Sequence, residues 1–98
     1  MIHPLRPHAR LMRALDRSAA IYGLTLHLHD ASERCWSSAT FTGNRLTLTL
    51  DLSGAEPAAW LAALPEEDLP VPAHLVADLV VTSVSGDRAT LEVLLLEA

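Results

Sequence analysis

The chain has 98 residues, of which 50% are hydrophobic and 19% are charged, and its formal net charge is −5 at pH 7. This composition is typical of a globular protein with one modest core and unlike that of a disordered chain. The charge is uneven, because the first 20 residues hold four arginines against one aspartate, whereas three arginines face eleven carboxylates in the remainder. An acidic body of this kind argues against nucleic acid as a partner.

Cys35 is the single cysteine of the sequence, so neither an intramolecular disulfide nor a cysteine cluster for zinc is available. A reducing cytoplasm is the expected location of such a protein. No apolar run approaches the ~18 residues of a membrane-spanning helix, and arginines interrupt the N-terminal segment every three or four residues. We therefore expect a cytoplasmic protein with no membrane partner. The absence of lysine, with much alanine and leucine, indicates a bacterial source.

The first predicted element is a helix over residues 7–20. Its inward stripe is expected to consist of Leu11, Ala14, Leu15 and Ser18. Three strands should follow, over residues 23–29, 34–42 and 45–52, because leucine alternates with polar residues in the first and the third. Residues 30–33 and the pair Gly43-Asn44 are the predicted turns between them.

Pairing apolar residues with apolar residues gives these three strands a predicted register. Phe41 then faces Leu46, and Leu28 faces Cys35, so the Cys35 side chain is expected to point into the core as a small buried hydrophobe. On the opposite face, one predicted row brings together His27, Trp36 and Asp51.

Ser53 and Glu56 have the spacing of a capping box, which predicts a second helix over residues 55–64. Pro65 is expected to end this helix. The segment that follows is acidic and rich in proline, and it has no periodic pattern.

Two further strands are predicted over residues 74–84 and 88–97, joined by the turn residues Ser85-Gly86-Asp87. The sequence therefore predicts one α+β domain that spans residues 1–98. It should contain a single five-stranded antiparallel sheet and two helices, in the order α-β-β-β-α-β-β.

His27 and His29 are the most chemically suggestive pair, because alternate residues of a strand point to the same side. With Asp51 as a third ligand, they form a candidate metal site built on strands. The alternative interpretation is that both histidines are polar residues on a solvated sheet face. No residue is predicted to be catalytic, and no cofactor is predicted.

The C-terminal hairpin is apolar on both faces, a pattern typical of strands that are covered on both sides. If the two helices cover one face of the sheet, a homodimer or a second protein partner is expected on the other. The alternative is that the helices lie on opposite faces. The residues predicted to line the interface are Trp36, Val76, Val80, Val84, Leu94 and Leu96.

The predicted order of elements is similar, in topology alone, to that of small acidic secretion chaperones. The expected function is a non-enzymatic protein-interaction module that acts as a homodimer through the apolar hairpin, and the resemblance in topology implies a chaperone- or adaptor-like role. The alternative function is that of a small metal-binding protein or enzyme that uses the His-x-His pair.

Overall fold

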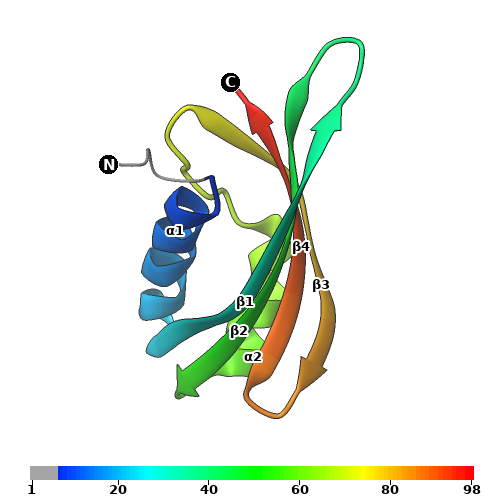
Figure 1. Ribbon diagram of the computed structural model, residues 1–98. Coiled ribbons are helices and arrows are strands. Elements are labelled where there is room, and N and C mark those ends of the chain that lie inside the picture. The colour runs from blue at the N-terminus through cyan, green and yellow to red at the C-terminus, as the bar shows by residue number, and fades with distance from the viewer. Residues whose placement is uncertain (1–6) are drawn as a thin grey trace, which may run out of the picture.

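The computed structural model describes residues 7–98, which form an antiparallel four-stranded sheet with two α-helices and one short 3-10 helix (Figure 1). Along the chain the elements are α1 (Pro7–Ile21), β1 (Leu24–Ser37), β2 (Thr42–Gly54), α2 (Pro57–Ala63), η1 (Leu64–Glu66), β3 (His74–Ser85) and β4 (Arg88–Glu97). The strands lie side by side in the order β1-β2-β4-β3. The predicted α+β class with an antiparallel sheet is confirmed, whereas the fifth strand and the predicted element order are wrong.

The missing strand is explained by β1, which runs without a break through residues 30–33, where a turn was predicted. The chain reverses instead at residues 38–41, where the Ser38 amide donates a 2.8 Å hydrogen bond to the carbonyl of Phe41. The pair Gly43-Asn44 lies inside β2 and makes no turn. With two strands rather than three between the helices, the order no longer matches that of the secretion chaperones.

The predicted register of the first strands is also wrong. Leu46 pairs with Glu33 rather than with Phe41, and Cys35 pairs with Asn44 and is exposed. The physical reason is that the leucines of β2 are covered by the helices above the sheet, so apolar partners on the neighbouring strand are not required. The long β1–β2 hairpin then extends beyond the end of β4 (Figure 1).

Both helices pack on the same face of the sheet (Figure 1). The stripe predicted for α1 is buried, and it joins one core cluster with Trp60 and Leu61 of α2. The strand residues in this cluster alternate, as the period of two requires. They are Leu46, Leu48, Leu50 and Leu52 of β2 and Ala89, Leu91, Val93 and Leu95 of β4. The opposite face of the sheet therefore has no helix on it.

The second helix is shorter than predicted, and Pro65 lies in η1, which continues it by one tighter turn. The predicted capping box does not form, because Ser53 still belongs to β2 and Glu56 caps α2 without a side-chain hydrogen bond. No helix within residues 7–98 combines the length and the apolar character that crossing a membrane requires.

Candidate functional site: the uncovered face of the sheet

We call the sheet face that carries no helix the outer face, and its members follow from the strand pairing. From β1 and β2 they are Thr25, His27, His29, Asp30, Ser32, Arg34, Trp36, Gly43, Arg45, Thr47, Thr49, Asp51 and Ser53. From β4 and β3 they are Arg88, Thr90, Glu92, Leu94, Leu96, Leu75, Asp78, Val80, Ser83 and Ser85. Most of these side chains are polar, but one end of the face is apolar.

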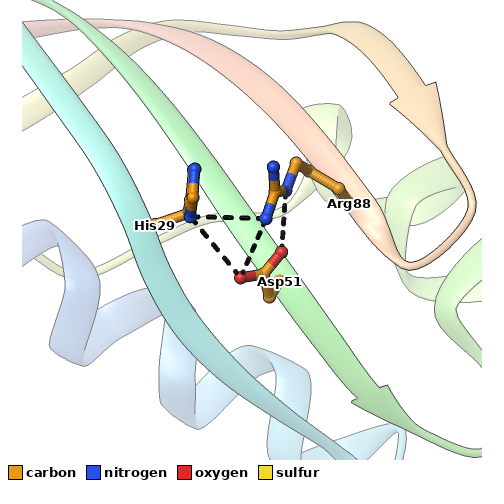
Figure 2. A network of polar contacts seen from close by, with 3 residues as sticks. All are labelled: His29, Asp51 and Arg88. Atoms are coloured by element: carbon orange, nitrogen blue, oxygen red, sulfur yellow. Dashed lines mark hydrogen bonds and ion pairs between the residues drawn. The ribbon is translucent and has the colours of Figure 1, made fainter.

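A polar network at the other end joins three strands (Figure 2). Arg88 at the start of β4 donates from Nε to Asp51 Oδ1 of β2 at 2.8 Å, and its Nη2 lies 3.5 Å from Oδ2. The same Nη2 lies 3.3 Å from Nδ1 of His29 on β1. His29 Nδ1 is 3.9 Å from Asp51 Oδ2, so the imidazole closes the triangle.

The electrostatics of this network are governed by Arg88. Its hydrogen bond holds the pKa of Asp51 below the usual value, and the same bond raises the pKa of Arg88. Because a guanidinium only donates, a hydrogen bond to His29 Nδ1 requires that this nitrogen accepts and that the ring proton sits on Nε2. All three side chains are about half exposed.

The residues predicted to hold a metal do lie on one face, since His27 is the register partner of Asp51 and His29 contacts it. However, the cation beside the Asp51 carboxylate is the Arg88 guanidinium. Within residues 7–98 no group of three or more His, Cys, Asp or Glu side chains has an arrangement that could hold a metal ion. Trp36 is remote from this network, because it pairs with Gly43.

Sequence reasoning missed Arg88. The signal that would have found it is the β2–β4 pairing, which sets Arg88 directly opposite Asp51.

The apolar end of the outer face is one row across all four strands, formed by Trp36, Gly43, Leu96 and Leu75. A Cβ atom at Gly43 would overlap with the backbone carbonyl of Leu95, so β2 and β4 approach closely here because no side chain intervenes. In this row Leu75 is 57% exposed, whereas Leu96 is 7% exposed, and Val80, which is 45% exposed, lies two rows further along β3. This end therefore resembles a surface that lacks a cover.

Two bulges in β3 change which of the predicted interface residues reach this face. They fall at Ala77 and Thr82, where the register with β4 shifts. Val76 consequently pairs with Leu95 and packs against the core, and Val84 pairs with Ala89 on the helix side of the sheet, where it is exposed. The other four predicted residues, namely Trp36, Val80, Leu94 and Leu96, belong to the outer face.

Charges lie in the row next to the apolar one, which reads Arg34, Arg45, Leu94 and Asp78 from β1 to β3. A shallow hollow of about 170 Å³ opens beside the two arginines. Its lining residues are Ser32, Glu33, Arg34, Arg45, Thr47 and Glu92.

Comparisons of the chain with protein-family models, with curated proteins and with solved structures find no match.

Proposed function

We propose that the protein is a non-enzymatic protein-interaction module that acts as a homodimer through its outer face. One observation carries this proposal: both helices cover the same side of the sheet, so Leu75, Val80 and Trp36 lie on the side without a cover. Apolar side chains of this size, gathered on one exposed surface, are typical of interaction sites. Tryptophan in particular is enriched at the centres of protein interfaces.

The edges of the sheet are less suited to binding than its face. Both edge strands carry bulges, at His29 in β1 and at Ala77 and Thr82 in β3. A bulge twists an edge and leaves residues unpaired, which is how proteins prevent strand-to-strand association. The favoured contact is therefore face to face rather than edge to edge.

The size of the outer face agrees with this proposal. Four strands spaced about 4.8 Å apart, with ten residues rising about 3.3 Å each, give roughly 600 Å² per chain. Two such faces together would bury about 1,200 Å², which is the lower end of the range for specific complexes. A further protein partner would need surface outside this face once the dimer has formed.

The single exposed thiol of Cys35 is compatible with the reducing bacterial cytoplasm proposed from the sequence.

Native mass spectrometry of the untagged protein, with neither metal nor chelator added, tests the proposal. The expected species has twice the chain mass of 10.6 kDa and no additional mass. A species of 10.6 kDa at every concentration, with about one metal ion per chain, would contradict the proposal and favour the second candidate function.

The second candidate is a small metal-binding protein or enzyme that uses His27, His29 and Asp51. The observation in its favour is that the strand pairing and the bulge bring these three residues to one end of the outer face. Arg88 would have to leave Asp51 for a metal ion to take its place. Zinc should then raise the melting temperature of the wild type and of His74→Ala, which lies outside the network, but not that of His27→Ala or His29→Ala.

A further inference from the structure

We propose a specific arrangement for the two chains: a two-fold axis runs parallel to the strands, between β2 and β4, and Arg34 of each chain pairs with Asp78 of the other. This inference rests on the proposed function, since it states how the homodimer is built and which side chains make a second copy of the chain the partner.

The first observation is a pair of like charges. Arg34 and Arg45 are direct partners across β1 and β2 on the outer face. Like charges in this position destabilise a sheet. Neither arginine makes an ion pair or a side-chain hydrogen bond with any other residue between 7 and 98. The two arginines share their hollow with Glu33 and Glu92, but within residues 7–98 neither arginine forms an ion pair.

The second observation is an acid at the far end of the same row. Leu94 pairs with Arg45 on one side and with Asp78 on the other, and Asp78 likewise makes no ion pair within residues 7–98. Three strand spacings, about 14 Å, separate β1 from β3. Arg34 and Asp78 of one chain are therefore too far apart to pair with each other.

A two-fold axis parallel to the strands brings Arg34 of one chain close to Asp78 of the other. It exchanges β1 with β3 and β2 with β4 and leaves every row at its own level, as an isologous interface requires. Arg34 then lies across from Asp78 of the partner subunit. Packed sheets are about 10 Å apart, a gap that an arginine and an aspartate side chain reach across together.

The same axis also matches the other rows. At the apolar end, Leu96 faces the partner's Gly43, which has no side chain, and Trp36 faces the partner's Leu75. At the polar end, Asp51 faces the partner's Arg88. The negative charge of the network in Figure 2 therefore lies opposite the positive charge of the same network in the partner subunit. In the charged row, Arg45 faces the partner's Leu94 beside the contact between Arg34 and the partner's Asp78.

A two-fold axis across the strands makes a poorer interface. Each strand would then lie over its own copy, with the ends of the sheet exchanged. Trp36 would face the partner's Thr25, so the apolar row would lie on polar residues, and Arg34 would face the partner's His27 rather than Asp78. The distribution of residues over the outer face therefore selects the axis parallel to the strands.

Charge reversal tests this arrangement with three variants. Arg34→Asp sets two aspartates against each other twice per dimer, and Asp78→Arg does the same with two arginines. We expect each variant to raise the dimer dissociation constant at least tenfold in sedimentation velocity, while circular dichroism shows an unchanged fold. An equimolar mixture of the two should restore dimers, because both contacts of the mixed dimer then join opposite charges. The double variant in one chain should restore them as well.

Arg13→Asp is the matched control, because Arg13 is exposed on α1 and lies away from the outer face. It should dimerise like the wild type. A dimeric wild type with single variants that associate equally well would overturn the arrangement and leave the homodimer standing. Weakened single variants that fail to associate when mixed would also overturn it. A wild type that is monomeric at all concentrations would contradict the proposed function itself.

Discussion

The indole nitrogen of Trp60 donates a 2.8 Å hydrogen bond to the hydroxyl oxygen of Ser18, although 42 residues separate the two along the chain. Ser18 in turn donates to Oε1 of Glu67 at 2.7 Å. Trp60 is fully buried and Ser18 is 3% exposed, so this relay ties α1, α2 and the segment after η1 together inside the core. The hydrogen bond gives the indole N–H an acceptor, so Trp60 can be buried without leaving a polar group unpaired.

Substituting Ser18 by alanine should therefore destabilise the protein. The indole N–H of Trp60 would lose its acceptor in a buried environment, which costs about 1–3 kcal/mol. Urea unfolding, followed by circular dichroism, measures the free energy of unfolding. The control is Ser53→Ala, since Ser53 is exposed and makes no capping bond. An equal effect of both substitutions would show that the relay contributes nothing.

The alternation of β2 makes a second prediction about stability. Leu48 is fully buried beneath the helices, whereas the adjacent Thr49 lies on the outer face. Leu48→Ala should lower the free energy of unfolding by about 2–5 kcal/mol, because it removes apolar contacts and leaves a cavity. Thr49→Ala should change it by less than about 0.5 kcal/mol, apart from any change in association. Reversed magnitudes would mean that the faces of β2 are assigned wrongly.

Those parts of the fold that depend on local pattern were predictable from the sequence. The helical stripe of α1, the leucine alternation of β2 and the C-terminal hairpin with its turn at Gly86 each follow from neighbouring residues. The reversal after β1 was not predictable in this way. Residues 30–33 have the composition of a turn, but they stay in the strand because β2 continues to pair with them.

Gly43 shows why the second turn was misplaced. A glycine before asparagine is the usual signal for a tight hairpin, yet Gly43 is in β2, where its missing side chain allows the backbone of β4 to come close. A glycine is needed at position 43 because the backbone of Leu95 on β4 packs against it, and a local sequence motif does not reveal such a tertiary contact. The structure thus gives the same residue a different physical role.

Gly43→Ala should consequently destabilise the sheet by about 1–3 kcal/mol, because the new methyl group overlaps with the Leu95 carbonyl. Gly86→Asn is the control: Gly86 has a φ of +61°, which asparagine tolerates, and nothing lies within 4 Å of the position a Cβ would occupy. Thermal unfolding of both variants at one protein concentration measures the difference. Equal melting temperatures would contradict the close approach.

The candidate site was predictable in part for a similar reason. Alternation along one strand indicated that His27 and His29 share a side of β1, and Asp51 reached the same side through the leucine pattern of β2. Arg88 was missed because its position depends on the order of the strands, which pairs β4 with β2. The bulges in β3 were missed because the spacing of Val76, Val80 and Val84 fits a regular strand with all three on one face. The two bulges interrupt this period in the structure.

The Asp51–Arg88 pair predicts a dependence of stability on pH. Since the pKa of Asp51 is lowered in the folded protein, its contribution to stability is present above the ordinary carboxyl pKa of about 3.9 and is lost as the pH falls through the lowered value. Asp51→Asn should therefore be less stable than the wild type at neutral pH, and the difference should shrink below about pH 4. Denaturant unfolding across this range measures it.

Asp30→Asn serves as the control, because Asp30 is exposed on the same face but lies outside the network of Figure 2. Its difference from the wild type should not follow the pH course seen for Asp51→Asn. A stability gap for Asp51→Asn that is the same at neutral and at acidic pH would argue that the carboxylate charge is not what stabilises the pair.

The central claim is that the outer face is buried between two chains, and sedimentation velocity on a matched pair of variants tests it most directly. Leu94→Arg adds a charge to the middle of the face, whereas Ile21→Arg adds the same charge to an apolar residue that is 80% exposed at the end of α1. We predict that the wild type and Ile21→Arg sediment at twice the chain mass of 10.6 kDa and that Leu94→Arg sediments as a folded monomer. A Leu94→Arg protein that remains as dimeric as the wild type would contradict the account.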